Sequence, residues 1–230
     1  MRGFQLLELA IVLSVLGVLT LMTTWAFSGA DQKNTRARSA AEAEVAREAI
    51  RAFLLANKRL PCPDTDGNGY ESCAATAENG FLPYLSLGLT DNVNNRMRYS
   101  VYRNAGINDI TRLEERTGDA ENTPDYRGYG DTLAALDLIK ALPLSDAHIR
   151  VAGVNPDGSS VCATGTHPAF ALIVSNEDKN ADGNVLDGIN TGMGACLASP
   201  LQPFAWNYDD FVLTESSAAL MGWLTQHLNN

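Results

Sequence analysis

The stretch MRGFQLLELAIVLSVLGVLTLMTTWAFSGAD, residues 1–31, decides how the N-terminal part of this chain folds. No charged residue lies between Leu9 and Ala30, and a helix of that length, at about 1.5 Å per residue, is long enough to cross a bilayer. Glu8 stands at the edge of this apolar run, where an ionised carboxylate entering hydrocarbon is costly. A lone membrane helix therefore leaves Glu8 unexplained.

Three interpretations of this segment remain open. It can be a cleaved secretory signal peptide, with the small residues 28–30 as the cleavage site. It can be a single-pass anchor. In the third interpretation the chain is cut after Gly3, so that Phe4 becomes the first residue and Glu8 lies one helical turn further on. Its carboxylate can then attract the α-amino group of a neighbouring subunit.

Residues 3–19, GFQLLELAIVLSVLGVL, closely resemble the class III signal of type IV pilins and type II secretion pseudopilins. The resemblance implies that a prepilin peptidase cuts after Gly3, that Phe4 becomes N-methylated, and that Glu8 acts in assembly. It implies as partners other copies or related pilin subunits, the inner-membrane assembly machinery, and the membrane before assembly. The chain departs from many pilins at Trp25, where those proteins carry a helix-kinking proline.

The segment after Asp31 continues as an amphipathic helix. The helix is expected to end near Asn57, because a residue preceding Pro61 disfavours the α region. The pairs Glu44–Arg47 and Glu48–Arg51 are expected on its surface. Its expected apolar face consists of residues that recur at three- and four-residue steps, namely Ala41, Val45, Ala46, Ala49, Ile50, Phe53 and Leu54. We therefore expect an α+β fold in which a long N-terminal α-helix, with a membrane-spanning first half, packs against the antiparallel β-sheet of a globular head with long loops. The expected parts are a leader (1–3), a transmembrane or filament-core helix (4–30), its amphipathic continuation (31–60) and a head (61–230) with an insertion at about 104–160.

Within the head, the apolar patterns predict short strands and two helices. Residues 98–103 alternate like a half-buried strand, and the continuous apolar run 169–175 predicts a central strand. Residues 204–215 predict a further strand or hairpin. The segments 132–142 and 217–228 predict helices.

The charge distribution argues against a nucleic-acid partner for the head. The net charge is −10, and residues 61–230 carry 22 acidic against nine basic residues, which repels phosphate backbones. No motif for a nucleophilic, metallohydrolase or phosphate-binding active site is present, so no enzymatic activity is expected. The carboxylate pairs Asp209-Asp210 and Glu114-Glu115 are interpreted as solvated faces.

Four cysteines follow the N-terminal segment, and their even number indicates two disulfides made in an oxidising compartment. Their spacings do not fit a structural zinc site or a redox motif. Because short loops lose less entropy on closure, the favoured pairs are Cys62 with Cys73 and Cys162 with Cys196.

Two loops, DTDGNG (64–69) and DKNADG (178–183), match the opening of a calcium-binding loop, in which alternate oxygens surround a hard cation. Both lack the glutamate expected at the twelfth position, so neither is a full EF-hand, and ordinary turn chemistry is the alternative. Ca²⁺ is the single candidate cofactor. Its candidate ligands are Asp178, Asn180, Asp182, Asn184 and Asp187, with Asp64, Asp66 and Asn68 as a weaker set.

The sequence as a whole predicts a structural subunit that polymerises through its N-terminal helix. It would reside in the bacterial inner membrane with a periplasmic head, and then in an extracellular pilus or a periplasmic pseudopilus. The sequence does not decide whether the subunit is a major pilin, a minor pilin or a pseudopilin. The alternative is a monomeric membrane-anchored extracytoplasmic binding module with calcium-shaped loops.

Overall fold

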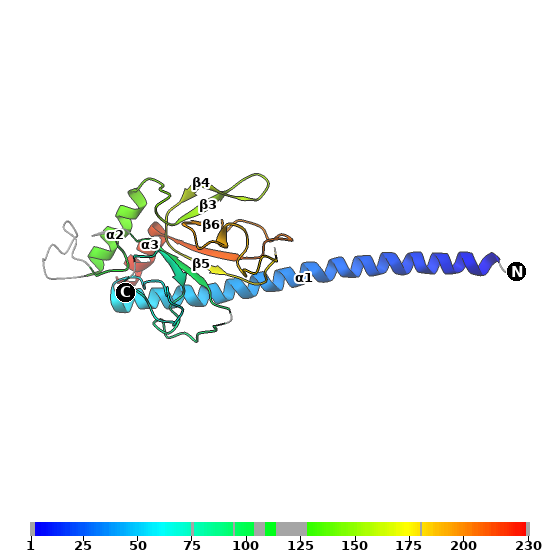
Figure 1. The fold of residues 1–230 in the computed structure, drawn as a ribbon, viewed down its shortest axis with the longest axis horizontal. Coiled ribbons are helices and arrows are strands. Elements are labelled where there is room, and N and C mark those ends of the chain that lie inside the picture. The colour runs from blue at the N-terminus through cyan, green and yellow to red at the C-terminus, as the bar shows by residue number, and fades with distance from the viewer. Residues whose placement is uncertain are drawn as a thin grey trace. The chain divides into compact units, whose positions relative to one another are not determined.

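The chain divides into two compact units, residues 1–38 and residues 39–230, and we call the second the head unit. Helix α1 (Gly3–Asn57) contributes to both units (Figure 1). The computed structural model describes residues 3–74, 76–93, 95–103, 109–113, 128–179 and 181–228, without the side chains of residues 3–7 and 23–31.

The head unit is an α+β structure, as predicted. Among the described residues of this unit, two further α-helices accompany α1, together with a 3₁₀ helix and seven strands. In chain order these elements are β1 (Asn79–Phe81), β2 (Arg98–Val101), α2 (Tyr129–Ala141), β3 (Arg150–Val154), β4 (Ser160–Thr166), β5 (Pro168–Val174), η1 (Gly188–Asn190), β6 (Cys196–Leu197), β7 (Phe211–Ser216) and α3 (Ser217–Leu228).

The strands form two sheets. A four-stranded antiparallel sheet has the order β1-β2-β5-β7, and a three-stranded sheet has the order β4-β3-β6, with β3 antiparallel to β4 and parallel to β6. All seven residues of β5 are buried, which confirms the central strand predicted from its continuous apolar run. Strand β2 and helix α3 also lie where the sequence predicts them.

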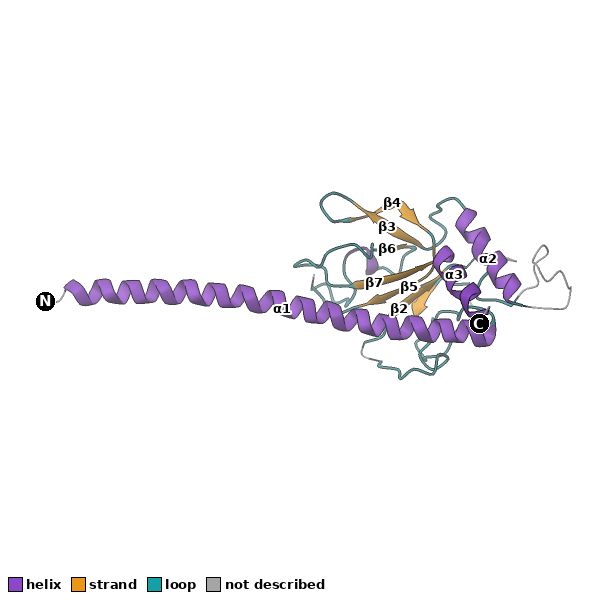
Figure 2. Cartoon of the chain, turned by 180° about the vertical axis from the view of Figure 1, so that it is seen from behind, coloured by secondary structure: helices purple, strands orange, loops and turns teal. Residues whose placement is uncertain are grey.

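Each face of the four-stranded sheet has its own core. Alternate residues of β5 point to opposite faces, so that Phe170 and Leu172 join one apolar cluster while Ala171 and Ile173 join the other. The first cluster includes residues from α1, α2 and α3, and α1 runs along the sheet whereas α2 stands beyond one end of the strands (Figure 2). The second cluster includes residues from β6, from the loop before η1 and from the segment that leads into β7.

Helix α1 ends at Asn57, as predicted, and Lys58 takes a positive φ of 56° immediately after it. The predicted surface pairs Glu44–Arg47 and Glu48–Arg51 are formed, at 2.5 and 2.8 Å. The apolar face differs from the expected one, since Val45 is 60% exposed. The buried positions follow three- and four-residue steps through Ser39, Ala43, Ala46, Ile50 and Leu54.

The prediction that the first half of the N-terminal helix spans a membrane is wrong. Over the residues that the structure describes, none of the helices combines the length and the hydropathy that crossing a membrane requires.

The described parts of 104–160, where an insertion was expected, contribute to the first core. Ile110, Leu136, Ile139 and Ile149 are each at most 1% exposed and belong to that cluster. The carboxylate pair Glu114-Glu115 lies outside the described residues.

Candidate functional site

The N-terminal unit carries a long apolar surface. The backbone of Gly3 and Phe4 is helical, and the side chain of Glu8 is exposed. Ten large apolar side chains between Leu9 and Met22 are each 52–65% exposed. They are Leu9, Ile11, Val12, Leu13, Val15, Leu16, Val18, Leu19, Leu21 and Met22.

Small and polar residues within this surface do not interrupt its apolar character. The hydroxyls of Ser14 and Thr20 donate hydrogen bonds to the helix's own carbonyls, at 2.7 Å to Ala10 and 2.9 Å to Gly17. A Cβ atom added at Gly17 would meet nothing within 4 Å. The glycine therefore leaves a notch that a neighbouring helix could enter closely.

Both predicted disulfides are present. Cys62–Cys73 closes the loop after α1, with a Cα–Cα distance of 5.2 Å, and Cys162–Cys196 joins β4 to β6 with a Cα–Cα distance of 5.9 Å. Cross-links of this kind form and persist in oxidising compartments. They place the head unit in a periplasmic or extracellular environment.

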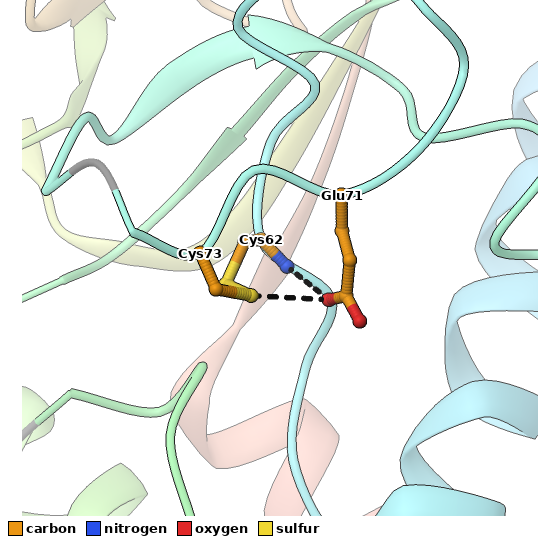
Figure 3. Close-up of side chains that lie close together, drawn as sticks. All are labelled: Cys62, Glu71 and Cys73. Carbon is orange, nitrogen blue, oxygen red and sulfur yellow. Dashed lines mark hydrogen bonds between the residues drawn. A yellow bond between two sulfur atoms is a disulfide. The ribbon is translucent and has the colours of Figure 1, made fainter.

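Glu71 lies against the first disulfide (Figure 3). One of its oxygens accepts a hydrogen bond from the backbone N–H of Cys62 at 3.1 Å and lies 3.3 Å from the Sγ of Cys73. The guanidinium of Arg59 donates to both oxygens, at 2.6 and 2.8 Å. Burial alone would raise the pKa of Glu71, but the hydrogen bonds from Arg59 and Cys62 outweigh it and hold this pKa below its ordinary value.

Cys62, Glu71 and Cys73 come close enough to suggest a metal site, with their ligand atoms within 4.8 Å of one another. A metal ligand must be a thiolate, and both sulfurs are instead bonded to each other. This group is therefore structural, with Glu71 linking the disulfide to Arg59 through hydrogen bonds.

The loop 64–69 is organised around Asp64, which is fully buried. Its Oδ1 accepts hydrogen bonds from the backbone N–H groups of Asp66, Gly67 and Asn68, and its Oδ2 accepts one from Gly69 at 2.8 Å. Asn68 donates to Asp66 through its side chain. The predicted weaker ligands Asp64, Asp66 and Asn68 are thus brought together as a hydrogen-bonded turn.

Arg96 lies beside this loop. It donates to the carbonyl of Gly67 at 2.6 Å and forms a bidentate pair with Asp91. The positively charged guanidinium of Arg96 therefore already lies against the turn, which favours the interpretation of residues 64–69 as an ordinary turn.

The loop 178–184 has the same internal hydrogen bonding. Asp178 accepts from the N–H groups of Asp182 and Gly183, at 3.2 and 2.8 Å, and Asp182 accepts from Asn184 at 2.8 Å. Asn180 lies outside the described residues. Asp178 and Asp182 are partly or fully exposed, whereas Asp187 is completely buried and belongs to a different group of side chains.

That group, the aspartate cluster, consists of Asp187, Asp209 and Asp210. One ligand atom from each lies within 4.8 Å of the others, and the three residues are at most 5% exposed. The interpretation of Asp209-Asp210 as a solvated face is therefore incorrect. Spacing along the chain does not indicate this cluster, because Asp187 precedes η1 whereas the other two residues directly precede β7, more than 20 residues later.

Backbone amides and one side-chain amide hold the cluster together. The Oδ2 of Asp187 accepts from the N–H of Asp209 at 2.9 Å, and its Oδ1 accepts from Lys179 at 3.2 Å. The Oδ2 of Asp210 accepts from the N–H of Asp187 at 2.9 Å and from the side chain of Asn190 at 2.8 Å.

Burial is the main cause of the perturbed pKa values here. It raises the pKa of Asp210 to about 7, against the opposing hydrogen bonds from Asn190 and Asp187, and it raises the pKa of Asp209. Arg98, itself buried, has its pKa lowered to about 10 by desolvation, although the charge of Asp210 opposes this shift.

The chain matches no protein-family model, no curated protein and no solved structure. The functional interpretation therefore rests on the residues and contacts described above.

Proposed function

We propose that this protein is a structural subunit of an extracytoplasmic filament, either a type IV pilus-like fibre or a type II secretion pseudopilus, and that it polymerises through the first part of α1. The observation that carries the proposal is the uncovered apolar surface between Leu9 and Met22. Glu8, at its edge, supplies the carboxylate expected of such a subunit.

The distribution of the apolar side chains favours a polymer over a dimer. The ten exposed residues occupy ten of the fourteen positions in about four helical turns, so they surround the helix instead of forming one stripe. A helix that is apolar on all sides is normally buried on all sides. Several neighbouring helices, as in a filament core, would cover it more completely than a single partner.

Charge provides the second element of the proposed assembly. Cleavage after Gly3 would create an α-amino group on Phe4, one helical turn from Glu8. In a low-dielectric filament core, the Glu8 carboxylate of one subunit and the α-amino group of the next attract each other strongly. This pairing would fix the axial register of the helices, with other copies or related pilin subunits as partners.

The experiment compares filament incorporation of wild-type protein with Glu8→Gln and Gly17→Leu variants, in cells that supply a prepilin peptidase and assembly machinery. The first variant removes the charge, and the second fills the notch without an internal clash. Both should fold and accumulate normally while the sheared filament fraction falls sharply. Asp137→Asn, which changes an exposed carboxylate on α2, is the matched control and should assemble normally.

Normal incorporation of both Glu8→Gln and Gly17→Leu would contradict the proposal. A variant that is missing from the whole-cell fraction has a folding defect. A variant that is present there but missing from the filament fraction has an assembly defect.

A further inference from the structure

We propose that the aspartate cluster, Asp187, Asp209 and Asp210, is a binding site for a divalent cation, with Ca²⁺ as the favoured ion. The ligand atoms of these residues lie within 4.8 Å of one another. Ca²⁺ binds oxygens at about 2.3–2.6 Å, so two ligands on opposite sides of it are separated by about 4.6–5.2 Å. The three carboxylates can therefore reach one ion with small adjustments.

A buried oxygen without a partner points independently to a missing ligand. Asp210 is only 2% exposed, and its Oδ1 atom is buried without a hydrogen-bond partner among the described residues. The other oxygen of the same carboxylate accepts two hydrogen bonds. A buried acceptor normally has a partner, and a cation bound by Oδ1 would supply it.

The neighbouring positive charges do not fill this role. The ammonium of Lys179 lies 2.5 Å from Glu177 and 3.6 Å from Asp209, so it is shared with a carboxylate outside the cluster. The guanidinium of Arg98 donates its hydrogen bonds to three carbonyl or amide oxygens outside the cluster. Three carboxylates are thus held together with too little positive charge, which a divalent cation would correct.

The donor set selects the class of ion. All three side chains offer carboxylate oxygens, which suit hard cations such as Ca²⁺ and Mg²⁺. Mg²⁺ requires ligands at about 2.0–2.1 Å in nearly ideal octahedral geometry, which places opposite oxygens only about 4.1 Å apart. Ca²⁺ accepts longer separations and less regular oxygen geometry, so we take it as the favoured ion.

This site differs from the one predicted from the sequence. Only Asp187 is common to both, because Asp178 and Asp182 lie partly or fully exposed in their own loop, whereas Asp187 is buried beside Asp209 and Asp210. The proposal is also independent of the filament function, since it concerns the head unit alone.

The test uses the purified full chain, stripped with EGTA and then titrated with CaCl₂ while its melting temperature is recorded. Extracellular calcium modules commonly have a Kd of about 10⁻⁴–10⁻³ M. At a hundredfold excess over Kd, the wild-type melting temperature should rise by about 5–10 °C. Asp210→Asn should weaken binding at least tenfold. Asp182→Asn, in the exposed neighbouring loop, should respond like the wild type.

A second measurement does not depend on stability. Tyr208 lies beside the cluster, since its hydroxyl is 3.4 Å from the side-chain nitrogen of Asn190, which also donates to Asp210. Tb³⁺ bound to wild-type protein should show tyrosine-sensitised luminescence that CaCl₂ displaces, and Tyr208→Phe should reduce this luminescence without abolishing the calcium-dependent rise in melting temperature.

Two results would overturn the proposal. One is a wild-type protein whose melting temperature is unchanged by calcium and whose Tb³⁺ luminescence is not displaced by it. The other is a calcium response that is lost in Asp182→Asn and retained in Asp210→Asn, which would place the ion in the loop. If Asp210→Asn does not fold, Asp209→Asn replaces it with the same expected loss.

Discussion

Replacement of both Cys62 and Cys73 by alanine is expected to destabilise the head unit by about 3 kcal/mol. The two cysteines are separated by 11 residues, and closing a loop of that size removes about 9 cal/mol/K of entropy from the unfolded chain. The same reasoning applied to Cys162 and Cys196, separated by 34 residues, gives about 4 kcal/mol. The longer loop should therefore contribute slightly more.

Urea unfolding of the full chain measures both effects, followed through Trp223, whose ring packs against Arg51 in the head unit. Wild-type protein unfolded under reducing conditions is the control, because it loses both disulfides without any substitution and should be destabilised by about the sum of the two effects. A loss below about 1 kcal/mol in either variant would refute the entropic reasoning, since the unfolded chain would then gain little freedom.

Two further predictions concern the loop after α1. Glu71→Gln should reduce the stability at neutral pH and make the stability fall less steeply in acid. Folding lowers the pKa of Glu71, so the ionised side chain stabilises the fold above the unfolded pKa. This stabilisation is lost as the pH falls through the folded pKa, and the variant lacks it at every pH. An acid-unfolding curve identical to that of the wild type would contradict this. Asp64→Ala should cost about 2–4 kcal/mol in the same urea assay, because several backbone N–H groups lose their acceptor; a loss of only a few tenths would show that water replaces the carboxylate.

Sequence patterns predicted those elements whose residues are compatible with only one local structure. The end of α1 was predicted from Pro61, and the central position of β5 was predicted from the continuous apolar run 169–175. The buried face of α1 was predicted less well. Residues 40–50 are rich in alanine, which is compatible with either side of a helix, so packing against the sheet decided that Val45 faces solvent.

The aspartate cluster could not be predicted because tertiary structure alone creates it. Asp187 was assigned to the loop that precedes it, since sequence spacing shows only neighbours along the chain. The fold instead turns its carboxylate toward Asp209 and Asp210, and the hydrogen bonds among their backbone and side-chain groups fix this arrangement. The disulfides were predictable because short loops limit the pairings.

Mass spectrometry of the mature N-terminus, on protein recovered from the cells that make it, tests the proposed filament function most directly. The proposal predicts a chain that begins at Phe4 with a methylated α-amino group, since cleavage after Gly3 creates the charge that Glu8 is expected to pair with. A chain that begins at Asp31 would have lost the whole apolar surface between Leu9 and Met22, and would contradict polymerisation through α1.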